Sequence, residues 1–569
     1  MLPIPKLPEI LEVNKILSKD ELAKAQNEAE CKSLSLEDCV LKKRLVTQEL
    51  LYKAASTFFK LPFITLIGQI IPHTVLKLIP EPIARTHQIV PYAQENNILK
   101  VAVLNPDDAQ TIEFIEKKTG LTLQIAMTDP ESLKDALKQY KKSLEIEFAE
   151  IAKASKKPIE ELAQEAPVIR IVDALLEHAI LRGASDIHIE PREKDVTVRF
   201  RVDGLLKEAM ILPKEVHAGV IARIKILANL KIDEHRVPQD GRFKVEIPNY
   251  KVSIRVSIFP MFDGEKIVMR ILQEDIKLLS INDLGFAPKQ LAMVVRTISK
   301  PHGIILVTGP TGSGKTTTLY GFLASLNKPH VNISTIEDPI EYRIHGINQS
   351  QVSPKVGFTF AIGLRSLLRQ DPNVIMVGEI RDSETADIAM NAALTGHLVL
   401  STLHTNDAVT AIPRLIDLGA PPFLIAQTTS LISAQRLVRK VCPHCIQSYV
   451  LSKEQANQLE AQFTMNTILE VMKREEAIND ESATVEGMRF FHGAGCAQCG
   501  MEGYRGRAAI HEILEITPEI STLIYGRAPA DALREAAKKQ GMLTLVEDAF
   551  IKAKQGLTTI DEILRVTRE

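Results

Sequence analysis

The chain has 569 residues, of which 45% are hydrophobic and 25% charged, so it is long enough for about three or four folded units of ordinary size. These proportions exclude a disordered chain, a collagen-like fibre and a disulfide-stapled mini-domain. The 69 Lys and Arg residues nearly balance the 71 Asp and Glu residues, and the net charge of -2 gives no overall attraction to nucleic acid or to an anionic membrane.

The N-terminal segment indicates a protein that is not exported. MLPIPKLPEI carries Glu9 close behind its only Lys and leads into no apolar run with a small-residue cleavage site. The most apolar stretch, Leu61 to Pro80, is interrupted by Pro72 and Lys77 and falls short of the ~20 apolar residues that a transmembrane helix needs. We therefore expect a cytoplasmic protein that reaches a membrane only through a partner.

Two domains are predicted ahead of the longest one. Residues 1–145 alternate helical patterns with short strand-like runs such as LKVAVL, which is typical of a small α/β domain. The charged stretch 146–165 predicts a linker or a solvated helix. Residues 166–278 begin with a helical pattern and continue into strands of alternating polarity such as KVSIRVSIF, so we expect an α+β domain with polar side chains on one sheet face.

Residues 279–569 change to longer βα units, which predict a parallel-sheet nucleotide-binding core. The apolar strand GIILVTG at 303–309 runs into a motif that fits G-x-x-x-x-G-K-[ST], and a helical pattern follows it. The bare motif arises by chance in roughly one chain in a hundred of this length. The candidate nucleotide-binding residues are Gly309, Pro310, Thr311, Gly312, Ser313, Gly314, Lys315 and Thr316.

This motif has a definite chemistry. Glycines let backbone N–H groups wrap the phosphates, Lys315 meets the charge of the β- and γ-phosphates, and the Thr316 hydroxyl ligates Mg²⁺. A Gly-rich turn without a ligand is the alternative. The intact strand, loop and helix context favours a phosphate loop.

Acidic residues follow the next apolar strands. The strand NVIMVGE ends in Glu379, where a Walker-B strand usually has Asp, and a Glu can hold the metal through water. TIEDPIEY at 335–342 holds Glu337, Asp338 and Glu341. Alone, this cluster would be a solvated acidic turn. Beside a phosphate loop we favour a catalytic cluster, because hydrolysis needs a carboxylate that orients or deprotonates water.

Two histidines flank the predicted strand LVLSTL. We expect His397 at its start and His404 in the loop after it. A lone His is more often a hydrogen-bonded packing residue. Two that flank one strand of a nucleotide core favour a sensor of the γ-phosphate or of an interface.

Four of the six cysteines form two C-x-x-C pairs, Cys442 with Cys445 and Cys496 with Cys499. In a chain without an export signal this pattern favours a structural Zn²⁺ held by four thiolates, which leaves no open coordination position. A redox or iron–sulfur site and unliganded thiols are the alternatives.

Together these motifs resemble the Walker A, Asp box, Walker B and His box of the secretion ATPase superfamily, which drives type II secretion and type IV pilus machines. The resemblance extends to ASDIHIEP, RFRVDG, PQDGR and GMLTLVEDAFIKAKQG and covers roughly residues 85–569. It implies a RecA-like core preceded by a PAS-like α+β domain and an N-terminal α/β docking domain. It also implies a zinc-binding module at about 440–508.

The resemblance also implies roles by position. Lys315 and Thr316 would bind phosphate and Mg²⁺, Glu341 would be the catalytic base, and Glu379 would order the water shell of the metal. His397 and His404 would serve the His box. Arg255 and Arg270, on strands before the core, resemble the arginines of the family that reach the γ-phosphate; the alternative is an exposed strand Arg paired with a local acid.

The implied function is a homohexameric motor at the inner membrane that hydrolyses ATP to assemble pilin subunits through a platform protein. The tetracysteine module, which resembles that of assembly and export ATPases, and the long N-terminal region distinguish the chain from pilus retraction ATPases. The chain length and the long N-terminal region favour pilus assembly. Type II secretion is the alternative, and a nucleic-acid translocase ranks below it because no strong basic channel is indicated. Cyclic-di-GMP binding is not expected, because the repeated Arg-Leu-Gly type motif for that ligand is not found.

Overall fold

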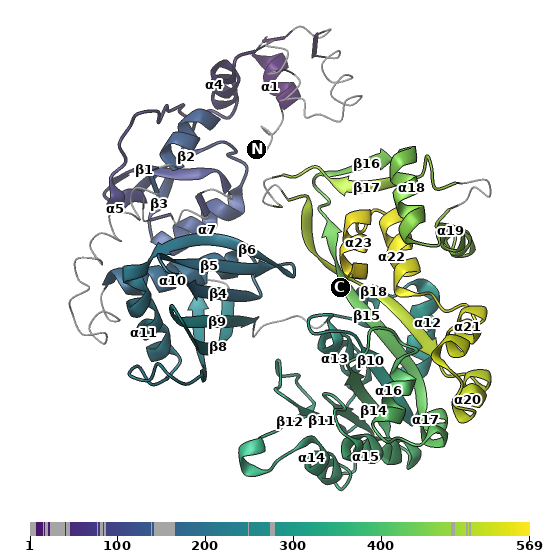
Figure 1. Cartoon of the computed structure of the whole chain (residues 1–569). Helices are drawn as coiled ribbons and strands as arrows, with labels where there is room; N and C mark the ends of the chain where they lie inside the picture. The colour runs from purple at the N-terminus through teal and green to yellow at the C-terminus, as the bar shows by residue number, and fades with distance from the viewer. Residues whose placement is uncertain are drawn as a thin grey trace. The chain divides into compact units, whose positions relative to one another are not determined.

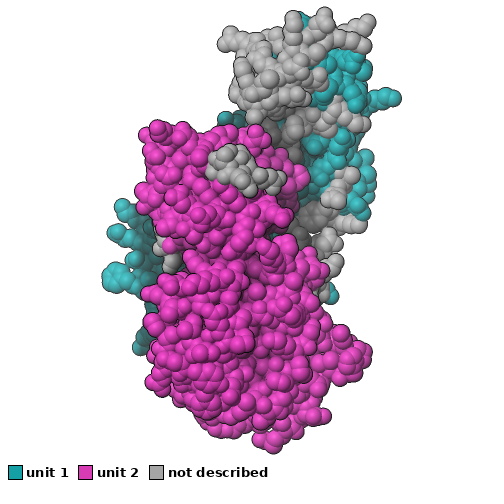
Figure 2. Space-filling view, turned by 90° about the vertical axis from the view of Figure 1, so that its right-hand side faces the viewer, with its two compact units in different colours: residues 1–273, 495–502 teal, residues 274–494, 503–569 magenta. Residues whose placement is uncertain are grey.

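A computed structural model describes residues 46–76, 87–137, 166–247, 250–273, 279–478, 484–496 and 502–568, with residues 7–14 and short pieces at 16–17, 21–22, 40, 78–79, 83–84, 139–140 and 499. The chain forms two compact units, residues 1–273 with 495–502 and residues 274–494 with 503–569 (Figure 2). The predicted linker at 146–165 lies outside the described residues. Among the helices of the described residues, none has both the length and the apolar character needed to span a membrane.

The N-terminal part of the first unit contains a three-stranded sheet. β1 (Ile89–Glu95) pairs antiparallel with β2 (Ile98–Val103), and α7 (Ala109–Thr119) carries the chain over to β3 (Thr122–Met127), which runs parallel to β2. The predicted strand LKVAVL is thus β2. The helices ahead of this sheet are α1 (Leu7–Val13), α4 (Gln48–Phe58) and α5 (His73–Leu76).

The second part of the first unit is a six-stranded antiparallel sheet in the order β6-β5-β4-β9-β8-β7. Apolar side chains such as Ile187, Ile254 and Met269 form one core with side chains of α10 and α11, so those helices cover one face (Figure 1). The elements are α10 (Ala166–Leu181), β4 (Asp186–Pro191), β5 (Asp195–Val202), β6 (Leu205–Pro213), η1 (Lys214–Val216), α11 (His217–Leu227), β7 (Gln239–Ile247), β8 (Tyr250–Met261) and β9 (Gly264–Gln273).

The other face of this sheet presents polar residues, as the alternating sequence predicted. Cross-strand pairing places one residue from each of five strands in a single row: Arg201, Asp186, Arg270, Arg255 and Arg242. Residues directly opposite on neighbouring strands point to the same side of the sheet. Four guanidinium groups and one carboxylate therefore share one line across the sheet.

The second unit is built on a seven-stranded sheet in the order β12-β11-β13-β14-β10-β15-β18. All neighbouring pairs are parallel except β15 with β18. The strands are β10 (Gly303–Thr308), β11 (Ile333–Glu337), β12 (Asn348–Gln351), β13 (Val374–Val377), β14 (Leu398–Leu403), β15 (Thr429–Val441) and β18 (Tyr504–Glu515). The predicted parallel core is present, and the mixed α/β class is confirmed.

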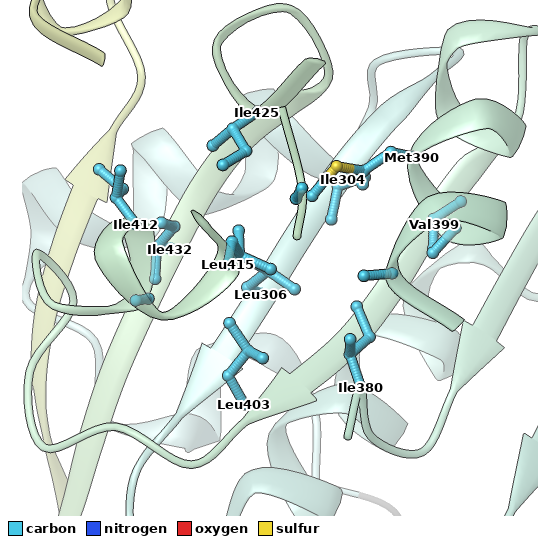
Figure 3. Packing of buried hydrophobic residues seen from close by; sticks show 14 of the residues in the cluster. Ile304, Leu306, Ile380, Met390, Val399, Leu403, Ile412, Leu415, Ile425 and Ile432 are labelled. Atoms are coloured by element: carbon cyan, nitrogen blue, oxygen red, sulfur yellow. The ribbon is translucent and has the colours of Figure 1, made fainter. Parts of the chain in front are cut away.

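The central strand β10 is buried along its whole length because helices cover both faces of the sheet. Ile304 and Leu306 belong to one core and Ile305 and Val307 to another, as the alternation of a strand requires. Figure 3 shows Ile304 and Leu306 among side chains of the first core. Truncation of a buried Leu such as Leu306 to Ala would cost about 2–5 kcal/mol.

Helices and a small two-stranded sheet complete the second unit. This sheet pairs β16 (Ile446–Val450) antiparallel with β17 (Arg489–Gly493). The helices are η2 (Ile281–Leu284), α12 (Pro288–Ile298), α13 (Lys315–Leu326), η3 (Pro354–Val356), α14 (Phe360–Leu367), α15 (Ser383–Leu394), α16 (Ala411–Asp417), α17 (Pro422–Thr428), α18 (Lys453–Gln462), α19 (Met465–Arg474), α20 (Pro518–Tyr525), α21 (Ala530–Lys539), α22 (Leu545–Lys554) and α23 (Ile560–Arg568).

Candidate active site

The predicted phosphate loop connects β10 to α13. β10 ends at Thr308, and α13 begins at Lys315 with Gly314 as its N-cap. Gly309 and Gly314 have φ angles of 145° and 90°, in the region that favours glycine. A Cβ atom on Gly309 would lie 2.5 Å from the carbonyl oxygen of Gln435, so a larger residue would force β15 to move. The N-terminus of a helix preceded by such a loop is suited to an anion.

Lys315 lies across this loop. Its Nζ donates hydrogen bonds to the carbonyl oxygens of Gly309, at 2.8 Å, and of Pro310, at 3.1 Å. Burial lowers the pKa of Lys315, while the charge of Glu379 raises it and that of Arg436 lowers it. The lysine is therefore within electrostatic reach of the acid that follows β13 and of an arginine on β15.

Gln435 on β15 is a site residue that the sequence analysis missed. It is buried, and its Nε2 donates to the Ser313 carbonyl oxygen at 2.7 Å while its Oε1 accepts from the Thr318 hydroxyl at 2.8 Å. It thus supports both the phosphate loop and the first turns of α13. A polar residue inside the apolar strand SLISAQRLV was the available signal, but only the pairing of β15 with β10 shows what it contacts.

The acidic segment 335–342 separates its carboxylates into different environments. Glu337 ends β11 and is buried, and it accepts hydrogen bonds from the hydroxyls of Tyr320 and Thr335 and from Gln349 Nε2. Burial raises the pKa of Glu337 despite these donors. Asp338 is exposed and Glu341 is half-buried. Glu337 is thus held by three donors inside the protein, while Asp338 and Glu341 are accessible to solvent.

Glu379 and His404 meet at the carboxyl ends of neighbouring strands. Glu379 follows β13 and His404 follows β14, and His404 Nε2 lies 3.2 Å from Glu379 Oε2. Glu379 also forms an ion pair with Arg381, and this contact raises the pKa of the arginine. The predicted Walker-B acid and the second histidine of the His box are therefore direct neighbours.

The other histidine, His397, lies at the opposite end of β14, where the parallel strands begin. His397 directly precedes β14, and its Nδ1 is 2.9 Å from the carbonyl oxygen of Ala392 in α15. The seven residues from His397 to His404 span roughly 20 Å along a strand. The structure confirms that the two histidines flank the strand, but it does not bring His397 to the phosphate loop of its own chain.

Comparison with known proteins agrees with this arrangement. Residues 161–565 match the family described as type II/IV secretion system protein. The chain belongs to this family. A second match, to the MshEN domain, covers residues 59–147. The predicted secretion ATPase family is thus confirmed.

Relatives in the family carry names from two kinds of machine. Type IV pilus assembly ATPase PilB of Myxococcus xanthus is 37% identical over 573 residues, which span 98% of each chain. Type II secretion system ATPase E of Vibrio cholerae is 45% identical over 409 residues, or 72% of this chain and 77% of that protein. The solved structure of the ATPase DotB of Yersinia pseudotuberculosis covers 70% of this chain and 93% of its own, at 23% identity and a TM-score of 0.51, which shows a shared fold.

The two arginines singled out before the core lie side by side on the first unit of this family member. Arg255 on β8 pairs in register with Arg270 on β9. Arg270 Nε lies 3.0 Å from Asp186 Oδ1, and Arg201 Nε lies 3.5 Å from the other oxygen of the same carboxylate. Arg270 is therefore paired with a local acid, as the alternative interpretation held. Its side chain is still 54% exposed.

The four cysteines Cys442, Cys445, Cys496 and Cys499 form one cluster, with all Sγ atoms within 4.8 Å of one another. Ideal tetrahedral Zn–S bonds of ~2.3 Å place sulfur atoms about 3.8 Å apart. Cys496 and Cys499 have an Sγ–Sγ distance of 3.6 Å, and the Cys496 N–H donates to Cys499 Sγ at 3.1 Å. The donor set and spacing fit a soft tetrahedral metal ion such as zinc.

Proposed function

We propose that the chain is the ATP-hydrolysing motor of a type IV pilus assembly machine. The observation that carries this proposal is the similarity to type IV pilus assembly ATPase PilB of Myxococcus xanthus over 98% of both chains. That similarity includes the N-terminal region as well as the nucleotide core. We place the motor on the cytoplasmic side of the inner membrane, where it would drive pilin extraction and polymerisation through a platform protein.

In the proposed reaction, the phosphate loop binds ATP. Backbone N–H groups at the start of α13 would hold the phosphates, and the Lys315 ammonium would offset the charge that builds up on the β- and γ-phosphates. The oxygen donors of Thr316 and Glu379 suit Mg²⁺, which prefers oxygen ligands and keeps several waters. Thr316 would hold the ion directly, and Glu379 would order its water shell. Bound Mg²⁺ would supply further charge neutralisation between the phosphates.

We assign Glu341 as the base that takes the proton from the attacking water. It is half-buried in the same segment as Glu337, whose carboxylate already accepts hydrogen bonds from Tyr320, Thr335 and Gln349. His404 would report the state of the γ-phosphate to Glu379 through their 3.2 Å contact. For His397, whose ring contacts the Ala392 carbonyl oxygen, we propose a packing role within its own chain.

Substitution of Glu341 by Gln tests this assignment. The variant keeps the size of the side chain but loses the proton acceptor, so we expect it to bind ATP and to retain it unhydrolysed, with turnover lowered roughly 100-fold or more. Phosphate release and the nucleotide bound to re-purified protein are the two measurements. Glu384→Gln, an exposed acid paired with Arg365, is the matched control. Normal turnover of Glu341→Gln would assign the base to another acid.

We further propose that six chains form a ring and that Arg255 and Arg270 reach the γ-phosphate during turnover. A phosphate loop at a sheet edge leaves the γ-phosphate open to charges from another domain, and a guanidinium suits a phosphate oxygen. Head-to-tail contacts close into a ring. Nucleotide hydrolysis would then be coupled to rotation of one domain on another.

We propose zinc as the metal of the four-cysteine cluster. Four thiolates satisfy a tetrahedral ion completely and leave no position for a reacting water, so the role would be structural. One zinc per chain in protein purified without chelators is the expected result. Iron–sulfur chemistry would instead give visible absorption and iron in the same analysis.

Type II secretion is the second candidate, since type II secretion ATPase E of Vibrio cholerae is 45% identical over 72% of this chain. Deletion of the gene from its source organism separates the two. Loss of surface pili with normal protein secretion supports pilus assembly, and the reverse supports secretion. Complementation with the wild-type gene and with Lys315→Ala shows whether the lost function needs the ATPase.

The MshEN match at residues 59–147 makes cyclic-di-GMP a ligand to test in the same protein. The sequence predicts no binding, because the repeated Arg-Leu-Gly type motif is not found. Titration calorimetry with the purified full chain decides the question. Saturable binding in the micromolar range would overturn the prediction.

A further inference from the structure

A buried carboxylate on the last strand of the sheet contacts the loop that follows His404. Glu512 lies on β18 and is 5% exposed, and its Oε1 accepts the N–H of Ala408 at 2.8 Å. The backbone N–H of Leu545, the first residue of α22, also lowers the pKa of Glu512, so it lies near the same carboxylate. Glu512 therefore joins the loop at 405–408 to the C-terminal helices.

The same loop is tied to the start of the phosphate loop. The N–H of Thr405 donates to Thr308 Oγ1 at 2.9 Å, and the two hydroxyls lie 2.7 Å apart. The Thr405 hydroxyl also lies 2.9 Å from the carbonyl oxygen of Asp407. Thr308 directly precedes Gly309, and Thr405 directly follows His404. A shift of this loop would displace both the base of the phosphate loop and the histidine at Glu379.

A second contact holds the loop from α21. Arg534 Nη2 lies 3.3 Å from Asp407 Oδ2, and Asp407 Oδ1 accepts the N–H of Thr410 at 2.7 Å. Arg534 also pairs with Asp531 on its own helix. Its positive charge offsets part of the repulsion between the carboxylates of Asp407 and Glu512.

We propose that Glu512 is a positioning residue for ATP hydrolysis. By accepting the N–H of Ala408 it fixes the loop at 405–408, and so holds His404 against Glu379 and Thr308 beneath the phosphate loop. This inference rests on the proposed role of that site in ATP hydrolysis. Glu512 acts through the loop and makes no contact with the reacting atoms.

The contact depends on the ionisation of Glu512. Burial raises the pKa of Glu512 and the Asp407 charge also raises it, while the N–H groups of Ala408 and Leu545 and the Arg534 charge lower it; the net pKa is about 7. The neighbouring titratable groups have other partners or face away from Glu512. On α22, Glu547 accepts the N–H of Thr544 and Asp548 pairs with Lys552. On β18, the adjacent His511 points to the other face of the sheet. Protonation converts one acceptor oxygen into a hydroxyl, so the contact weakens as pH falls through about 7.

Two substitutions of Glu512 separate positioning from simple packing. Glu512→Ala removes both acceptors, and we expect kcat to fall about 10-fold while the dissociation constant for ATP changes less than about twofold. Glu512→Gln keeps one acceptor, so kcat should fall about threefold at pH 8. The ratio of wild-type to Gln kcat should shrink toward one at pH 6, because protonated Glu512 then resembles the amide. A purely structural residue would lower stability without this pH-dependent ratio.

Glu562→Gln is the matched control. Glu562 is also fully buried and pairs with Arg439 and Arg565, away from the loop at 405–408, so its loss should lower stability and leave kcat per folded chain unchanged. If Glu512→Ala does not fold, the pH-dependent ratio of Glu512→Gln decides alone. Wild-type kcat for Glu512→Gln at every pH from 6 to 9 would overturn the inference. Normal turnover of both Lys315→Ala and Glu341→Gln would instead reject the proposed site itself.

Discussion

The seven-stranded sheet of the second unit and the six-stranded sheet of the first place their polar residues differently. In the parallel sheet the site residues follow strand ends: Gly309 comes after β10, Glu379 after β13 and His404 after β14. In the antiparallel sheet the arginines lie within the strands, and Arg255 and Arg270 are held by cross-strand register. In the parallel sheet the site residues lie at the carboxyl ends of the strands, whereas in the antiparallel sheet the arginines lie across the polar face.

This difference has a physical cause. Parallel strands bring all their carboxyl ends to one edge, where loops are free to carry glycine and charged residues while the strands stay apolar. An antiparallel sheet with one covered face alternates apolar and polar residues, so every second side chain faces outward. Substitutions in the seven-stranded parallel sheet should therefore change the chemical step. Substitutions in the six-stranded antiparallel sheet should change the coupling between domains or the local ion pairs.

The largest effect is expected at the phosphate loop. Lys315→Ala removes the charge that meets the β- and γ-phosphates, so hydrolysis should fall by roughly 10²–10³-fold or more and ATP binding should weaken. Steady-state phosphate release and fluorescent nucleotide titration are the measurements. The exposed Lys300→Ala is the control and should behave as wild type. A Lys315→Ala variant with normal turnover would remove the phosphate loop from the mechanism.

A smaller effect is expected for the arginine row. Arg255→Ala should lower kcat about 10–100-fold and largely preserve nucleotide binding, because the guanidinium would act in the transition state. Arg270→Ala should lower kcat as well, and it also removes the ion pair of Arg270 with Asp186. Arg199→Ala, a polar-face arginine paired with Glu190, is the control.

ATPase rate and mass by light scattering across a dilution series complete the arginine test. Activity per chain should rise with protein concentration as the proposed ring forms. A fully active monomer that tolerates loss of both arginines would contradict the ring and its coupling role.

The cysteine cluster should affect stability more than chemistry. Cys496→Ser removes one of four thiolates, so we expect loss of the bound zinc and a lower unfolding temperature, with the ATPase rate of the folded protein changed less than about threefold. Atomic absorption and thermal unfolding test this, with Cys39→Ser as the control that retains zinc. Metal-free wild-type protein purified under reducing conditions without chelators would reject the zinc site.

The smallest effect is a pH dependence within the second unit. Burial lowers the pKa of His511 from 6.5 to about 3. Below pH 6.5 the unfolded chain therefore binds a proton at His511 that the folded chain does not bind. As pH falls, this difference lowers the free energy of unfolding by about 1.4 kcal/mol per pH unit. Glu512 works in the opposite direction, because its raised pKa favours proton uptake by the folded state.

The contribution of His511 to the pH dependence of stability is isolated by comparing His511→Gln with the wild-type protein. Between pH 7 and pH 5, the stability of His511→Gln relative to wild type should rise by about 2 kcal/mol. Gln keeps a donor for the Leu284 carbonyl oxygen, which His511 Nε2 contacts at 3.0 Å. Urea unfolding at both pH values is the measurement, and a pH-independent difference would show that His511 titrates normally in the fold.

The sequence by itself determined the phosphate loop and the strands around it. Its glycines, Lys315 and Thr316 follow a local rule, since a strand, a tight loop and a helix are adjacent in the chain. The cysteine pairs and the alternation on the antiparallel sheet are equally local patterns. The family followed from the order of these motifs along the chain, and Glu379 and His404 could be placed at strand ends because strand boundaries are readable from apolar runs.

The tertiary structure decided which of these residues meet. No local pattern identifies the partners of Gln435 and Glu512, because Ser313 and Ala408 lie more than 100 residues away and are reached only when β15 and β18 take their places in the sheet. The pairing of Arg270 with Asp186 depends on the antiparallel register of β4 and β9, which a periodic pattern does not specify.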